Sequence, residues 1–219
     1  MDSQNKEITE YSAKNDGGDN KKTTRINLPN KLTIFRIILV PVFMVFILLP
    51  VPNETWSKIF ASALILIAAL TDFIDGFLAR RLKLVTNFGK LMDPLADKFM
   101  VVGAMIAITA SDSFADIRFL TVWVTTVVFF RELAVTSIRL LAKSADDNVI
   151  AANFVAKLKT FSQIVCIMTV LLEESVITQN LSAPSYLFSY ITMAVMLILT
   201  IYSGVVYFKT YWKYIDPEK

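Results

Sequence analysis

The sequence contains no histidine, a single cysteine and only six glycines among its 219 residues. Without histidine, every mechanism that needs an imidazole base or an imidazole metal ligand is excluded. The lone cysteine, Cys166, forms no disulfide within the chain, and its position in an apolar run is typical of a small buried side chain. Acid–base chemistry must therefore depend on carboxylates, lysine, tyrosine or this thiol. A bound metal must be held mainly by oxygen, which magnesium and manganese prefer.

Charge is also scarce, because 19% of the residues are charged and 55% are hydrophobic. That composition is too apolar for an ordinary soluble protein, and apolar runs of about 18 residues or more indicate membrane helices. We predict an all-α integral membrane protein with six transmembrane helices, at roughly 32–49, 57–78, 92–110, 117–141, 150–172 and 185–208. Since the first run contains Arg36 and Pro41, the alternative is five spans plus one interfacial helix. Pro29 and Asn30, typical of a helix start, also allow a short N-terminal interfacial helix.

The basic residues predict the orientation in the membrane. With a cytoplasmic N-terminus, the outer loops contain only Lys58 and Arg118 of the 22 Lys and Arg residues. Basic residues in short loops stay on the cytoplasmic side, so both termini are predicted to be cytoplasmic. Residues 1–26 are polar and predict a disordered cytoplasmic tail, and residues 27–219 form the predicted membrane domain. The predicted outer loops lie near 50–58, 111–118 and 173–184.

Four aspartates stand at the edges of two apolar runs. Asp72 and Asp75 are three residues apart near the end of the second run, and Asp93 and Asp97 are four apart at the start of the third. The short link predicts antiparallel helices, so the four carboxylates can converge in a polar cavity that faces the cytoplasm. Carboxylates packed together repel one another unless they are neutralised, and two divalent cations that share ligands would neutralise them.

Small residues accompany the acids. Gly76, Ala79 and Arg80 continue the helical face of the first aspartate pair, and Gly89 lies in the link. Without bulky side chains, this face leaves room for a pyrophosphate or another flat group to approach the backbone. The alternative is that the acids are only interfacial charges or helix caps. A divalent-cation or proton transporter is a third reading, but transport predicts polar groups across the whole membrane, and these acids gather near one face.

The pattern Asp72-x2-Asp75-Gly76-x2-Ala79-Arg80-x8-Gly89-x3-Asp93-x3-Asp97 resembles the signature of the CDP-alcohol phosphatidyltransferases at every fixed position. The resemblance implies a six-helix fold that moves a phosphatidyl group from a CDP-linked donor to an alcohol and releases CMP. It implies two Mg²⁺ or Mn²⁺ ions on the four aspartates, with Asp97 also acting as the base. By position, Asp72, Gly76, Ala79 and Arg80 would lie along the CDP. We expect Gly89 to approach the donor too, with Thr33 and Arg36 on the opposite wall.

Cations on the predicted inner side suggest a phosphate on the acceptor. Arg131 and Arg139 are eight residues apart in the fourth run, and Lys157 begins the fifth. We expect Glu132 to hold an arginine in place. Lys143 and Lys159 are interpreted as membrane anchors.

The stretches "NLPNKLTIFR", "RELAVTSIRLL" and "AKLKT" are similar to the bacterial branch of the family that forms phosphatidylglycerophosphate, except that Ala156 replaces a usual glycine. This resemblance implies CDP-diacylglycerol and sn-glycerol 3-phosphate as substrates, a bacterial plasma membrane and a homodimer, with no nucleic-acid partner. Inositol phosphate, serine or phosphatidylglycerol as the acceptor are the alternatives within the family.

Overall fold

The computed structural model describes residues 28–82, 87–145, 154–177 and 185–212, and within these ranges it is entirely helical apart from short turns. Each predicted apolar run corresponds to one long helix, with bounds that differ by a few residues, so the all-α class is confirmed. The predicted tail at 1–26 lies outside the described residues. The long helices are α2 (Leu28–Leu48), α3 (Glu54–Leu82), α4 (Asn87–Ala110), α5 (Arg118–Ala145), α6 (Phe154–Leu172) and α8 (Leu187–Tyr211), joined by the short helices η1 (Asp112–Ile117) and η2 (Glu173–Ile177).

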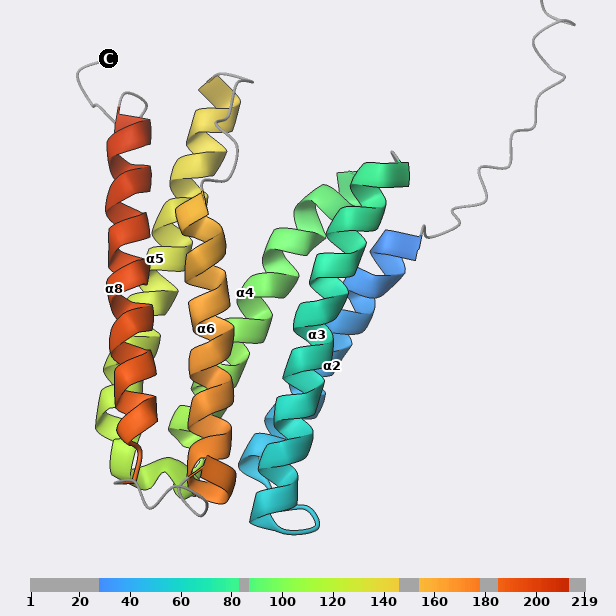
Figure 1. The fold of residues 1–219 in the computed structure, drawn as a ribbon. Coiled ribbons are helices and arrows are strands. Elements are labelled where there is room, and N and C mark those ends of the chain that lie inside the picture. The colour runs from blue at the N-terminus through green and yellow to red at the C-terminus, as the bar shows by residue number, and fades with distance from the viewer. Residues whose placement is uncertain (1–27, 83–86, 146–153, 178–184, 213–219) are drawn as a thin grey trace, which may run out of the picture.

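The helices form two groups of three (Figure 1). In the first group, α2 packs along both α3 and α4, and in the second, α8 packs along α5 and α6. Contacts of α4 with α5 and of α3 with α6 join the groups. The start of α2, the end of α3 and the start of α4 lie at one end of the bundle, with the ends of α5 and α8 (Figure 1). We call this the basic end, because Lys31 at the start of α2, Arg139 near the end of α5 and Lys209 at the end of α8 belong to it.

Small side chains allow α2, α3 and α4 to approach closely. Ala68 of α3 and Ala104 of α4 are fully buried in the core. A Cβ atom added to Gly103 would lie only 2.9 Å from Cγ1 of Val40 on α2. Small residues at helix crossings are typical of membrane bundles, where close packing replaces the hydrophobic driving force.

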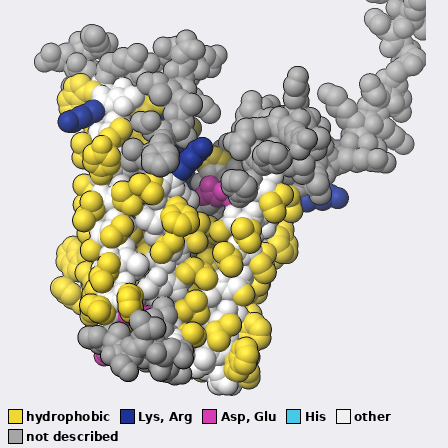
Figure 2. Space-filling model, viewed as in Figure 1, with side chains coloured by type: hydrophobic (Ala, Val, Ile, Leu, Met, Phe, Trp, Pro, Cys, Tyr) yellow, Lys and Arg dark blue, Asp and Glu magenta, His cyan; other side chains and the backbone are white. Residues whose placement is uncertain are grey.

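The outer surface of the bundle is strongly apolar (Figure 2). Large hydrophobic side chains such as Phe119, Trp123 and Ile198 are more than half exposed, and a soluble monomer rarely shows a continuous apolar surface of this extent. Within the described residues, four segments are long and apolar enough to cross a membrane: Asn30–Leu48, Glu54–Asp72, Asp112–Leu140 and Leu187–Tyr211. The sequence-based prediction of six spans is therefore supported for four helices.

The end opposite the basic end is stabilised by polar contacts. Ser57 Oγ lies 2.8 Å from the carbonyl oxygen of Phe46 and accepts a hydrogen bond from the backbone N–H of Val51. Glu173 in η2 is completely buried and accepts hydrogen bonds from the backbone N–H groups of Phe188 (2.8 Å) and Ser189 (2.6 Å). A carboxylate at these first amides of α8 satisfies donors that have no partner within the helix.

Candidate active site

Three helices meet at one guanidinium group. Nη1 of Arg36 on α2 lies 2.8 Å from Oδ1 of Asp72 on α3 and 3.0 Å from Oδ1 of Asp97 on α4. The Arg36 side chain is fully buried, whereas the two carboxylates are 39% and 41% exposed. The guanidinium therefore contacts the carboxylates from the interior, and their remaining surface is accessible to a ligand.

The packing of α2 explains this convergence. Because α2 runs along both α3 and α4, a long side chain from its third turn can reach both neighbours. Asp72 belongs to the second half of α3 and Asp97 to the first half of α4, at the same end of the bundle. An acidic and a basic side chain lie close together where the surface is hollowed between the two groups of helices (Figure 2).

The remaining signature residues belong to these two helices. Asp75, Gly76, Ala79 and Arg80 follow Asp72 within α3, and Gly89 and Asp93 precede Asp97 within α4. Their side chains lie outside the described part of the structure, so the predicted convergence is seen directly only for Asp72 and Asp97. Thr33, one turn before Arg36 on α2, is fully buried.

The donor set fits a hard divalent cation. Asp72 and Asp97 bring carboxylates from two different helices to the same nitrogen of Arg36, and both carboxylates are partly open to solvent. Carboxylate oxygen is the ligand that magnesium and manganese favour. Among the described side chains there is no cluster of three or more potential ligands. Asp75 and Asp93, the other two acids of the signature, are outside that set.

Lys98 connects this acidic site to a basic cluster on α5. It is adjacent to Asp97 in sequence, and its ammonium group donates a hydrogen bond to the carbonyl oxygen of Pro94 at 3.0 Å. It also interacts electrostatically with Asp97 and Glu132, and with both Arg131 and Arg139. The acidic site and the cations of α5 therefore lie within one electrostatic neighbourhood.

Glu132 is the centre of the basic cluster. Its Oε1 lies 3.1 Å from Nη1 of Arg131 and also pairs with Nζ of Lys159 on α6. The three side chains are between 8% and 13% exposed, so the carboxylate offsets the charge of two nearly buried cations. The expectation that Glu132 holds an arginine is confirmed. The interpretation of Lys159 as a membrane anchor was wrong, because its ammonium group is buried against Glu132.

Polar residues of α8 orient the two arginines. Arg131 donates a hydrogen bond to the hydroxyl of Ser203, and Arg139 donates one to the hydroxyl of Tyr207. The Tyr207 ring also faces both guanidinium groups, with centroid distances of 5.9 Å to Cζ of Arg131 and 4.6 Å to Cζ of Arg139. Cation–π contacts of this kind favour a fixed guanidinium orientation.

The predicted acceptor residues differ in their settings. Arg131 and Arg139 share Tyr207, as their helical spacing suggested, whereas the side chain of Lys157 is exposed at the start of α6. Sequence reasoning did not identify Ser203 and Tyr207, because both stand in an apolar run and belong to no recognisable motif. Only the packing of α8 against α5 reveals their role.

The sequence of this chain is similar to known proteins over most of its length. A sequence model of the CDP-alcohol phosphatidyltransferase family matches residues 26–202. A protein of Bacillus subtilis (strain 168) named CDP-diacylglycerol–glycerol-3-phosphate 3-phosphatidyltransferase is 37% identical over 196 residues, covering 85% of this chain and 96% of the relative.

Two further relatives carry related names. The protein with the same name from Escherichia coli (strain K12) is 36% identical over 147 residues, which cover 65% of this chain and 75% of the relative. A probable phosphatidylglycerophosphate synthase of Mycobacterium tuberculosis (strain ATCC 25618 / H37Rv) is 35% identical over 181 residues, covering 83% and 79%. With the aspartate signature on α3 and α4 and a family match over most of its length, the chain belongs to the CDP-alcohol phosphatidyltransferase family.

Proposed function

We propose that this protein transfers the phosphatidyl group of CDP-diacylglycerol to sn-glycerol 3-phosphate, giving phosphatidylglycerophosphate and CMP. The observation that carries the proposal is the proximity of two sites of opposite charge. One is the partly exposed carboxylate pair on Arg36, and the other is the arginine pair at Tyr207, and Lys98 interacts electrostatically with residues of both. A donor with a metal-bound pyrophosphate and an acceptor with a phosphate need such a pair of sites. The names of the relatives support this choice of donor and acceptor.

In this proposal Asp97 is the general base. Its carboxylate takes the proton of the C1 hydroxyl of glycerol 3-phosphate as the hydroxyl oxygen attacks the lipid-side phosphorus of the donor. A new phosphorus–oxygen bond forms, and the bond from that phosphorus to the pyrophosphate bridging oxygen breaks. CMP leaves with the bridging oxygen. The 41% exposure of Asp97 leaves its carboxylate accessible to the incoming alcohol.

Asp72, Asp75, Asp93 and Asp97 would hold two Mg²⁺ or Mn²⁺ ions, which suit an all-oxygen donor set. When bound, these ions would stabilise negative charge on the pyrophosphate and on the leaving CMP. Arg36 would keep Asp72 and Asp97 oriented from the buried side.

The CDP group would lie along the face of α3 formed by Asp72, Gly76, Ala79 and Arg80. Gly89 would line another wall of the donor site, and Thr33 and Arg36, which are both fully buried, would support the opposite wall from behind. Arg131 and Arg139 would bind the acceptor phosphate, because guanidinium groups can donate two hydrogen bonds each to phosphate oxygens. Lys157, whose side chain is exposed at the start of α6, would add positive charge near the acceptor phosphate.

The membrane arrangement is part of the proposal. All six long helices would span a bacterial plasma membrane, with both termini cytoplasmic and the active site facing the cytoplasm. The helix ends that the sequence predicts to be cytoplasmic lie together at the basic end, which supports this orientation. The two long helices outside the four apolar segments are α4, which begins with the charged stretch around Asp93, and α6, which carries Lys157 and Lys159 near its start. We also propose a homodimer, and that residues 27–219 form the membrane domain behind the tail at 1–26.

An acceptor survey of the purified protein tests the function. CDP-diacylglycerol is offered with glycerol 3-phosphate, inositol phosphate, serine or phosphatidylglycerol, and CMP release and the lipid product are measured. Turnover with glycerol 3-phosphate alone is the expected result. Turnover with another of these alcohols instead would assign a different branch of the family. Divalent-cation or proton flux in vesicles, with no CMP released under any condition, would favour the transporter reading.

A further inference from the structure

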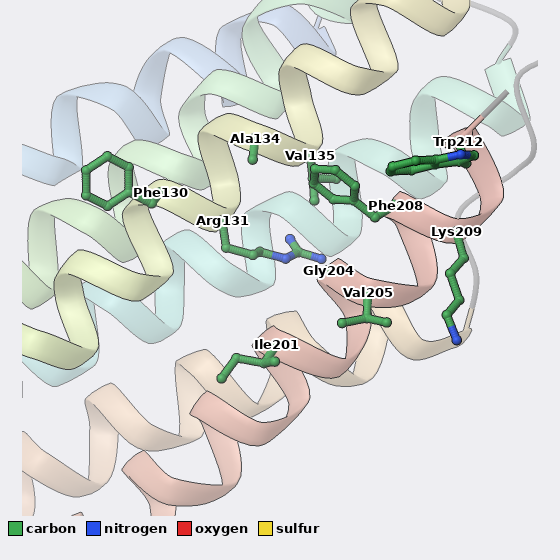
Figure 3. Close-up of a pocket in the computed structure, with 10 residues that line it drawn as sticks. All are labelled: Phe130, Arg131, Ala134, Val135, Ile201, Gly204, Val205, Phe208, Lys209 and Trp212. Atoms are coloured by element: carbon green, nitrogen blue, oxygen red, sulfur yellow. The ribbon is translucent and has the colours of Figure 1, made fainter. Parts of the chain in front are cut away.

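A groove between α5 and α8 adjoins the candidate active site and shares Arg131 with it (Figure 3). It is an open groove of about 710 Å³ on the surface of the bundle. The α5 wall consists of Phe130, Arg131, Ala134 and Val135, and the α8 wall of Ile201, Gly204, Val205, Phe208, Lys209 and Trp212.

Most of the groove surface is apolar and faces outward. Phe130 is 65% exposed and Ile201 is 50% exposed, and Val205 and Phe208 continue the same α8 wall toward the helix end. In a bilayer this surface lies at the level of hydrocarbon, where water is absent. A groove of this kind is filled by an acyl chain or by another apolar segment.

The groove also carries positive charge. Arg131 extends across it toward Gly204 of α8 (Figure 3), and its Cγ lies 3.4 Å from the position of a Cβ at Gly204. The Arg131 Nε–H is buried with no hydrogen-bond partner among the described residues. Lys209 and Trp212 lie at the C-terminal end of α8, where a lysine and a tryptophan are typical of the membrane interface. Among the described lining residues, none is acidic.

We propose that this groove binds one anionic glycerophospholipid of the surrounding leaflet. One acyl chain would lie along Val205, Phe208 and Ala134, and the lipid phosphate would contact Lys209. A second copy of the chain fits this surface less well. Copies in one membrane share the same orientation, so a symmetric contact here would bring cations to the same depth with no acid among the described lining residues to offset them.

Fluorescence quenching in a bilayer tests the proposal. The sequence has three tryptophans, so the double variant Trp56→Phe/Trp123→Phe leaves Trp212 as the single reporter. The protein is placed in phosphatidylcholine vesicles, and a small fraction of the lipid is replaced by phosphatidylglycerol or phosphatidylcholine with brominated acyl chains. We expect stronger quenching by the brominated phosphatidylglycerol, with an apparent association about five-fold higher for each cation that contacts it.

Two substitutions separate a groove site from general surface attraction. Ala134→Phe fills the groove and keeps Lys209, and it should remove the preference for the anionic lipid. Ala194→Phe makes the same change on an exposed part of α8 outside the groove and should have no effect. Lys209→Gln should reduce the preference about five-fold, and Lys209→Arg should retain it.

Three outcomes would overturn the proposal. The first is equal quenching by the two brominated lipids, and the second is an undiminished preference in Ala134→Phe. The third is an increase in quenching by both lipids when the protein is diluted in the bilayer. Such an increase would mean that a second copy covers the groove when the protein is dense.

Discussion

The guanidinium of Arg36 lies 2.8 Å from the carboxylate of Asp72, although the two residues belong to different helices and only the arginine is fully buried. The same nitrogen lies 3.0 Å from Asp97. A single buried cation thus holds two carboxylates that we assign to metal binding, one of which is also the proposed base. Removing it should affect both the stability of the fold and the affinity for metal.

Arg36→Gln should lower the free energy of unfolding by about 1–3 kcal/mol, because two carboxylates lose a charge-assisted hydrogen bond. The loss is limited by the solvent exposure of both acids. Thermal unfolding in detergent measures the change, and Arg118→Gln is the matched control. Arg118 also pairs with an aspartate, Asp112, but that acid is fully exposed, so the control should shift the midpoint much less. Equal shifts would show that Arg36 has no special structural role.

Metal removal should abolish turnover. Four signature aspartates and the absence of histidine leave oxygen as the main ligand, which suits magnesium or manganese. The measurement is CMP release before and after chelation, followed by titration with each ion. Undiminished turnover in chelator-treated protein, with metal content confirmed to be negligible, would contradict the two-ion proposal.

Asp97→Asn should reduce turnover by at least about 10²-fold, the lower end for loss of a general base. The amide still accepts a hydrogen bond from Arg36, so the fold should be retained. Donor binding, measured separately with labelled CDP-diacylglycerol, should persist. A variant that turns over at nearly the parent rate would place the base on another residue.

Arg139→Ala should weaken the use of glycerol 3-phosphate, by about 10- to 150-fold in acceptor kcat/KM for the loss of one charge-assisted contact of about 1.5–3 kcal/mol. Titration of glycerol 3-phosphate at saturating donor measures this, with donor binding determined in parallel. Lys31→Ala is the matched control, because Lys31 is an exposed cation at the same end of the bundle. If both variants give the parent curve, Arg139 serves only to orient the chain in the membrane.

Tyr207→Phe tests whether α8 positions Arg139. Loss of the hydroxyl removes its hydrogen bond to the guanidinium and keeps the ring at 4.6 Å. We expect KM for glycerol 3-phosphate to rise about 10-fold, because a hydrogen bond from a charged guanidinium is worth at least about 1.5 kcal/mol, with kcat little changed. A fall in kcat with an unchanged KM would contradict a role in acceptor positioning.

Hydrophobic runs were sufficient to locate the helices, because a membrane helix must satisfy its backbone internally and keep apolar side chains outside. They predicted the first helix at 32–49, and α2 spans Leu28–Leu48. The neighbouring positions of Asp72 and Asp97 also followed from the short link between their helices. The sequence did not predict the rotation of each helix about its own axis, which decides the direction of each side chain.

That rotation explains why the environment of Lys159 was not predicted. Lys157 and Lys159 are two residues apart and therefore point in different directions from α6. Sequence spacing could not decide which of them is buried, and the packing of α6 places Lys159 against Glu132. The ion pairs of Arg36 with Asp72 and Asp97 could not be predicted from spacing either, because they depend on α2 lying along both α3 and α4.

The polar contacts at the end opposite the active site have a consequence for motion. Ser57 ties the turn between α2 and α3 to the backbone of Phe46, and Glu173 ties η2 to the first amides of α8. None of these contacts involves a residue that is proposed to bind substrate, so ligand binding should leave them unchanged. At the basic end, ion pairs such as those of Arg36 and Glu132 can exchange their partners for a bound phosphate or metal. We therefore expect amide hydrogen exchange to be slow at the first end throughout the catalytic cycle, and to respond to substrates only at the second.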